Sequence, residues 1–390
     1  MPLVSVIIPI YNAALYLQQC LDTIISQTLT DIEIICINDG STDNTPQILE
    51  KYKKKDSRIK VLHQSNKGAG VARNLGLEHA TGDYLSFLDA DDFFDPSLLE
   101  EAHKRITEKK ADIVIYRIQT YDQNTEKYAN AEFAFAREYF TKKDPFSYLD
   151  MPDYIFNSFQ NWTWNKMFRR EFITENNIRF QPLKRTNDLL FTCTALVLAK
   201  RITLLDKILA FYRIGTTDNL QSTNHLAPTD FYKAFSSLQD FLKSKGIYPV
   251  VKKSFVNWAA DGCVSNLESL KAGSSFEVLY NTVKHEALQK LDINGNNHSY
   301  FYNIYNIQEL NKIRELSCTE FLFNKLNTAR AELSYIKKNL GLDIGKQFDK
   351  FSYRLGRAIT FCPRVISKGI ARIKQHGLKY ILKLVQIKIN

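Results

Sequence analysis

The segment Tyr84-Leu-Ser-Phe-Leu-Asp-Ala-Asp-Asp92 joins a short apolar run to three aspartates. The run reads as a buried strand, so the carboxylates are expected at its carboxyl end. Like charges repel at short range, and burial penalises each of them. A divalent cation would offset this cost, since carboxylate oxygens suit Mg²⁺ or Mn²⁺. Asp89-x-Asp91 therefore suggests a metal-held diphosphate, with a solvated turn or a helix cap as the alternative.

The surrounding sequence alternates apolar strands with amphipathic helices. This order predicts an α/β fold with a mostly parallel sheet flanked by helices. Ligands of such sheets bind beyond the carboxyl ends of the strands. The expected strands are 3–8, 32–37, 59–62, 84–88 and 113–116, and the expected helices are 13–26, 45–55 and 70–79.

The domain organisation follows from the change in pattern along the chain. At 390 residues, two domains are the natural expectation. Residues 1–225 form the first, with a nucleotide-binding half (1–120) and an acceptor half (121–225) that opens with an aperiodic excursion at 121–160. Beyond it, a helical domain (226–345) precedes a tail (346–390). The helices expected there are 231–243, 251–270, 276–291 and 308–339.

The net charge of +10 is concentrated in the tail, where residues 346–390 contain eleven Lys or Arg and one acidic residue. Its basic amphipathic pattern is typical of helices that dock on an anionic membrane surface. A cap packed on the preceding helices is the alternative, and nucleic acid is not expected as a partner.

The composition predicts a cytoplasmic protein. The six cysteines lack paired spacing, which argues against a zinc site or a disulfide framework. We see no signal peptide at the start and no apolar stretch of the roughly 18 residues needed to span a bilayer. With the tail, this indicates a peripheral enzyme or binding protein on the inner face of the cytoplasmic membrane.

Further polar motifs follow the other expected strands. In Asn38-Asp-Gly-Ser-Thr-Asp43, Gly40 permits a tight turn that leaves the Asp39 carboxylate free to accept a hydrogen bond from a base. Tyr11, after the first strand, could stack on that base or pack at the rim. Lys67 and Arg73 flank a glycine-containing helix entry suited to phosphate. Each motif alone is also compatible with an ordinary turn or helix entry, and for the Asp39 turn this plain interpretation is the favoured one.

Together these motifs resemble family 2 glycosyltransferases over residues 3–225. The match includes Pro9-Ile-Tyr-Asn12, Asn38 to Asp43, Asn66-Lys-Gly-Ala-Gly-Val-Ala-Arg-Asn74 and Asp89 to Asp92. The resemblance implies an inverting enzyme with the GT-A fold and a nucleoside-diphosphate sugar donor. It assigns nucleotide binding to Pro9, Tyr11, Asn12, Asp39, Lys67, Gly68, Arg73, Asp89 and Ala90. It also assigns Mn²⁺ or Mg²⁺ to Asp91 and Asp89, with Asp91 as the more direct ligand.

The second block of the resemblance supplies the remaining site residues. The segment Trp162-Thr-Trp-Asn-Lys-Met-Phe-Arg169 is similar to one that implies acceptor or donor-sugar contacts for Trp164, Asn165 and Lys166. Core tryptophans and a carboxylate-paired lysine are the alternative. Asp188 matches the family's general base, while Asn187 replaces the usual glutamate before it. No third metal ligand is assigned, and His225 is a weak candidate.

The implied function is transfer of a hexosyl or N-acetylhexosaminyl group, from a UDP-sugar, to a glycan or lipid-linked acceptor. Such bacterial enzymes act in surface polysaccharide or lipooligosaccharide synthesis. A sugar-1-phosphate nucleotidyltransferase is one alternative, but it should carry a glycine-rich loop where Tyr11 and Asn12 stand. A non-catalytic nucleotide-sugar-binding protein is another, and the retention of Asp89, Asp91 and Asp188 argues against it.

Overall fold

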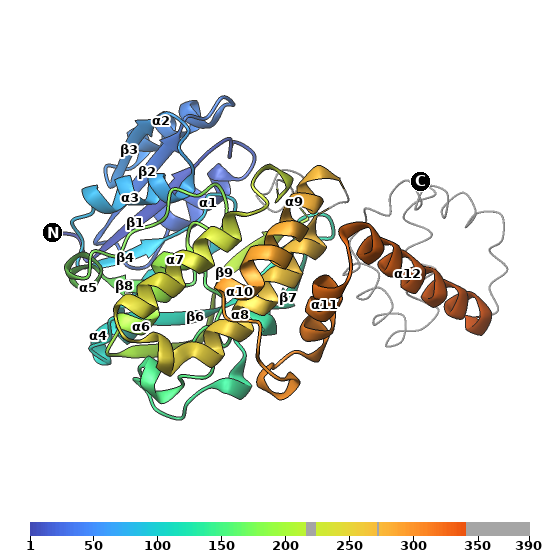
Figure 1. Cartoon of the computed structure of the whole chain (residues 1–390). Helices are drawn as coiled ribbons and strands as arrows, with labels where there is room; N and C mark the ends of the chain where they lie inside the picture. The colour runs from blue at the N-terminus through green and yellow to red at the C-terminus, as the bar shows by residue number, and fades with distance from the viewer. Residues whose placement is uncertain (216–223, 271–272, 341–390) are drawn as a thin grey trace. The chain divides into compact units, whose positions relative to one another are not determined.

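The computed structural model describes residues 1–215, 224–270 and 273–340 (Figure 1). Contacts divide them into two compact units: residues 1–215 and 230–258 form the first, and the other described residues form the second. The sequence places a boundary near residue 225, whereas 230–258 join the first unit. The basic tail expected at 346–390 lies outside the described residues.

Within the described residues, nine strands form one mixed sheet in the first unit. The strands β1, β2, β3 and β4 pair in parallel, as expected, and so do β6 and β9. By contrast, β8, β5 and β7 pair antiparallel with their neighbours. The strand order is β3-β2-β1-β4-β8-β6-β9-β5, with β7 paired to β6. The bounds are β1 (Val4–Ile10), β2 (Ile32–Asp39), β3 (Ile59–Gln64), β4 (Tyr84–Phe87), β5 (Phe93–Phe94), β6 (Ile113–Asp122), β7 (Lys127–Asn130), β8 (Lys166–Arg169) and β9 (Ile202–Ile214).

Helices cover both faces of this sheet. Those of the first unit are α1 (Leu17–Ile25), α2 (Thr45–Lys55), α3 (Ala69–His79), α4 (Leu98–Glu108), α5 (Arg170–Glu175), α6 (Leu189–Leu198) and α7 (Asp230–Ser244). Alternate residues of a strand face opposite ways. Val6 and Ile8 accordingly share a core with α1, α2 and α4. Ile7 faces α3, and Phe87 packs on Phe191 of α6 with ring centroids 5.3 Å apart.

The second unit is helical. Besides residues 224–229, it contains the later part of α8 (Tyr248–Ser269), α9 (Ser274–Thr282), a π-helical turn at Val283–Ala287, α10 (Leu288–Lys290), α11 (Ile304–Glu315) and α12 (Cys318–Leu340). The single helical stretch expected at 308–339 is therefore two helices. The break is caused by a capping box, in which the Glu320 side chain accepts from Ser317 N and Glu320 N donates to Ser317 Oγ.

The sheet brings the polar strand ends together. Because β1, β2 and β4 run in parallel, the residues that follow them lie at one edge. The antiparallel pairing of β5 with β9 matches Phe93 with Phe211, which brings Arg213 to the aspartate segment. No helix in the described part of the chain has the length and hydrophobicity needed to cross a membrane.

Close packing of α3 on the sheet depends on Gly76. A Cβ atom added there would lie 2.4 Å from Ile7 Cγ2 and 2.8 Å from Ile37 Cδ1. We expect Gly76→Ala to lower the free energy of unfolding by about 1–3 kcal/mol through overpacking, against the usual helix gain. Urea denaturation measures this change. Glu78→Ala, at an exposed position of the same helix, is the control, and equal stability of both variants would contradict the packing.

Candidate functional site

The first two strand-end loops are tied to one another. Asn12 N donates to Ser41 Oγ over 3.0 Å, and Thr42 N donates to Asn12 Oδ1 over 2.8 Å. Asn12 has a positive φ of 48°, a conformation that asparagine tolerates better than most residues. Tyr11 beside it is 51% exposed, so its ring lies at the rim of the loop pair. Pro9 lies within β1.

Asp39 is buried against the loop before α3. Its Oδ1 accepts from Lys67 N and Gln64 Nε2, and its Oδ2 accepts from Gly68 N, over 2.6–2.8 Å. Gly40 makes the turn possible, because it has a φ of 73° and a Cβ there would lie 2.7 Å from Asn66 N. The carboxylate therefore organises the loop around Gly68, and Oδ2 retains a lone pair. The Lys67 side chain is exposed.

Arg73 connects the aspartate segment after β4 to the segment before α6. This buried α3 residue donates from Nη2 to Asp89 Oδ1 over 2.6 Å and from Nη1 to Asn187 Oδ1 over 2.9 Å. Its guanidinium also lies over the Phe180 ring, 5.4 Å from the centroid. Because Asn187 is neutral, it accepts this bond without a charge of its own.

The aspartates after β4 form a compact carboxylate cluster. Oxygens of Asp89, Asp91 and Asp92 lie within 4.8 Å of one another. Burial, reinforced by Asp89, raises the pKa of Asp91 to about 6. Burial and the two neighbouring charges raise the pKa of Asp92 well above its usual range. Ala90 between them is buried. The positive charges of Arg73 and Arg213 therefore offset the repulsion within the cluster only in part.

Arg213 closes the other side of this cluster, and sequence reasoning missed it. Its backbone N donates to Asp92 Oδ1 and its Nε to Asp91 O, each over 2.8 Å. The guanidinium also donates to Gln19 Oε1 and Gln123 Oε1 and is nearly fully buried. Its place follows from the β5–β9 pairing, for which the sequence contains no local pattern.

Asp188 stands at the N-terminus of α6, next to Asn187. Its backbone oxygen accepts from Thr192 N, but in the described part of the chain no other residue donates to its carboxylate. Burial, chiefly, raises the pKa of Asp188. Asp89 adds to this effect, and the positive charges of Arg73 and Lys166 oppose it. A carboxylate with a raised pKa and no other donor bound to it is suited to accept a proton.

The residues expected at the sugars are all buried. Lys166 is fully buried and its Nζ donates to Gln160 O, Trp162 O and Asn165 Oδ1 over 2.7–2.8 Å. Burial lowers the pKa of Lys166 to about 7, although three oxygen acceptors favour the ammonium form. Trp164 stacks on Trp162 with centroids 4.9 Å apart. Lys166 therefore fixes the backbone of the loop that precedes β8. Trp162 in this loop is only partly buried, so it is more accessible than Trp164.

Comparison with known proteins places these motifs in context. The sequence model described as "Glycosyl transferase family 2" matches residues 5–176. Glycosyltransferase GlyG of Streptococcus pneumoniae serotype 4 is 30% identical over 271 residues, which cover 66% of this chain and 87% of GlyG. EpsH of Bacillus subtilis is 33% identical over 56% of this chain, and the chain spans only 63% of EpsH.

One solved structure supports the fold. The crystal structure of S. aureus TarS 1–349 in complex with UDP-GlcNAc matches with a TM-score of 0.52 at 23% identity. The match covers 81% of this chain and 92% of that chain. At this identity the likeness concerns the fold alone. The expected α/β architecture of the GT-A type, with a helical C-terminal region, is confirmed.

The contacts of Lys166 lead to a stability prediction. Lys166→Met should lower the free energy of unfolding by about 3 kcal/mol, because buried oxygens would lose their donors. Chemical denaturation tests this, with Lys54→Met at an exposed position as the control. Unchanged stability together with a higher KM for a sugar donor would instead assign Lys166 a direct role at the sugar.

Proposed function

Because the chain belongs to glycosyl transferase family 2, we propose that it transfers a sugar from a nucleoside-diphosphate sugar to a hydroxyl group, with inversion at the anomeric carbon. The observation that carries this proposal is the double contact of Arg73. One bond leads to Asp89, in a carboxylate cluster suited to a leaving diphosphate. The other leads to Asn187, the neighbour of Asp188.

The nucleotide would bind over the first two strand ends. The exposed Tyr11 ring offers a stacking surface for the base, and the remaining lone pair of Asp39 offers an acceptor for a base N–H. The positive end of α3 favours the phosphates. Uridine is the base to test first, since the fold neighbour TarS was crystallised with UDP-GlcNAc.

The carboxylate cluster fits a divalent cation. All of its donor atoms are carboxylate oxygens, and Asp92 Oδ2 is buried without a hydrogen-bond partner in the described part of the chain. Asp91 and Asp89 would hold Mn²⁺ or Mg²⁺, while Asp92 supports the turn through Arg213. When bound, the cation stabilises negative charge on the departing diphosphate.

Asp188 would act as the general base. It takes the proton of the acceptor hydroxyl as that oxygen forms its bond to the anomeric carbon. The bond from that carbon to the diphosphate oxygen breaks at the same time, and its electron pair leaves with the diphosphate. Attack opposite the leaving group inverts the configuration. Arg73 holds Asp89 and Asn187 in register through this change.

The acceptor is proposed as a glycan or lipid-linked oligosaccharide in surface polysaccharide or lipooligosaccharide synthesis. Residues 121–160 and the helical second unit are where its specificity would lie. Docking on the inner face of the membrane through 346–390 rests on the basic pattern of that segment alone. The family match favours sugar transfer over nucleotidyl transfer.

The base assignment leads to a kinetic prediction. Asp188→Asn should lower kcat by about 10²–10⁴-fold, because the acceptor proton loses its acceptor. Nucleotide binding, measured by calorimetry with UDP and Mn²⁺, should be retained. Asp83→Asn, which neutralises an exposed carboxylate, is the control. Unchanged turnover of Asp188→Asn would show that Asp188 is not the general base. If the wild type binds the nucleotide but transfers no sugar, a non-catalytic binding protein would be favoured instead.

The pH profile gives the same prediction a second readout. The base works only when ionised, so kcat/KM is full above the pKa of Asp188 and falls as the pH drops through it. Because that pKa is raised above its usual 3.8, the acid limb should lie above pH 3.8. The residual activity of Asp188→Asn should lack this limb, and an identical limb in the variant would assign it to another group.

The metal assignment leads to a binding prediction. Asp91→Asn should weaken Mn²⁺ binding by at least about tenfold, since even changes to groups around metal ligands cost about 10–100-fold. Electron paramagnetic resonance of free Mn²⁺ measures this without turnover. Asp83→Asn is again the control. If Asp91→Asn and the wild type bind Mn²⁺ with equal affinity, Asp91 is not a ligand of the cation.

A further inference from the structure

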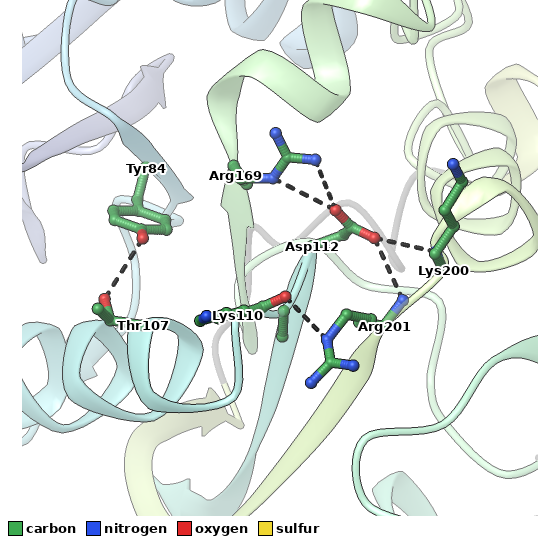
Figure 2. A pocket seen from close by; sticks show the side chains of 8 residues that line it. Tyr84, Thr107, Lys110, Asp112, Arg169, Lys200 and Arg201 are labelled. Carbon is green, nitrogen blue, oxygen red and sulfur yellow. Dashed lines mark hydrogen bonds and ion pairs between the residues drawn. The ribbon is translucent and has the colours of Figure 1, made fainter.

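Figure 2 shows a pocket of about 500 Å³. It lies at the end of the sheet opposite to the aspartate cluster, because Tyr84 in its wall begins β4 and Asp89 follows the other end of that strand. Its wall is formed around the beginnings of β4, β6 and β9 and the end of β8. The lining residues are Tyr84, Thr107, Lys110, Ala111, Asp112, Arg169, Lys200 and Arg201. Four of these side chains are basic and one is acidic, so the lining carries a net positive charge.

Both oxygens of Asp112, the one carboxylate in the lining of the pocket, accept hydrogen bonds from neighbouring residues. Asp112 Oδ1 accepts from Arg169 Nη2 over 2.7 Å, and Oδ2 accepts from Lys200 N over 2.9 Å and Arg201 N over 3.2 Å. These bonds converge on Asp112 at the centre of Figure 2. The buried Asp112 thus fixes the backbone that carries Lys200 and Arg201, while Arg169 is neutralised by Asp112 and Glu171.

The other three basic side chains, Lys110, Lys200 and Arg201, are exposed and form no ion pair with a described residue. Neither Lys110 nor Lys200 has a carboxylate within ion-pair distance in the described part of the chain. Arg201 donates from Nε and Nη2 to the carbonyls of Lys109 and Lys110, just after α4, which leaves Nη1 with no bond to a described residue. On the other side, Tyr84 OH lies 3.3 Å from Thr107 Oγ1. Ammonium groups, a guanidinium edge and hydroxyls are the donors that phosphate oxygens accept.

We propose that this pocket binds the phosphate group of a small phosphate ester, separately from the nucleotide site. Its volume lies within the 300–1,000 Å³ range typical of small-molecule sites and exceeds what one phosphate would fill. A glycerol phosphate, free or as the headgroup of an anionic lipid, fits within this volume and has the complementary charge. The proposal does not depend on the donor or on the chemistry at Asp188.

The test uses the full chain with UDP and Mn²⁺ present in excess, so that the nucleotide site is filled. Calorimetry with sn-glycerol 3-phosphate at fixed ionic strength measures binding to the wild type and to Lys110→Asn/Lys200→Gln. Asparagine suits the positive φ of 46° at position 110. Loss of two cations should weaken binding by about tenfold or more. The control Lys54→Gln/Lys104→Gln removes two exposed lysines elsewhere and should leave binding unchanged.

A second arm distinguishes the sources of the phosphate. Flotation with phosphatidylglycerol vesicles compares the same variants, and all of them retain residues 346–390. Weaker flotation of Lys110→Asn/Lys200→Gln than of the control pair identifies the ligand as a lipid headgroup. Loss of calorimetric binding alone identifies a free phosphate ester. If neither measurement separates the two double variants, the proposal is overturned, whether or not the chain transfers sugar.

Discussion

Repulsion among Asp89, Asp91 and Asp92 is the constraint on which the rest of the site depends. Two unit charges about 4 Å apart repel by about 4 kcal/mol at an effective dielectric constant of about 20. The carboxylate oxygens here lie within 4.8 Å of one another. Arg73 offsets the repulsion from α3, and Arg213 does so from β9. The two arginines therefore connect the strand-end cluster to helix α3 and to strand β9.

Because Asn187 is neutral, it affects which carboxylates interact with the positive charge of Arg73. An acid there would compete with Asp89 for Arg73, whereas Asn187 only accepts a hydrogen bond. The positive charge of Arg73 is then left to Asp89 and Asp188, and it partly opposes the rise in the pKa of Asp188 caused by burial. The departure from the family pattern therefore bears on how basic Asp188 is.

Much of the fold could be predicted from the sequence, because its parallel half is built from strong local patterns. Helix α2 spans Thr45–Lys55, as its apolar spacing indicated, and the motifs after β1, β2 and β4 do lie at one edge. The two-residue strand β5 and its pairing with β9 leave no local pattern, so the contacts of Arg213 could not be anticipated. Lys166 reads as a charged site residue, yet three oxygen acceptors hold it inside the protein.

The central claim is that the carboxylate cluster holds the leaving group while Asp188 stands apart as the base. A crystal structure with Mn²⁺ and UDP, with anomalous scattering used to locate the metal, tests it most directly. The account predicts one anomalous peak against the Asp91 and Asp89 carboxylates, with the diphosphate beside it and Asp188 free of metal. A peak on Asp188, or no peak at the cluster with UDP bound, would contradict it.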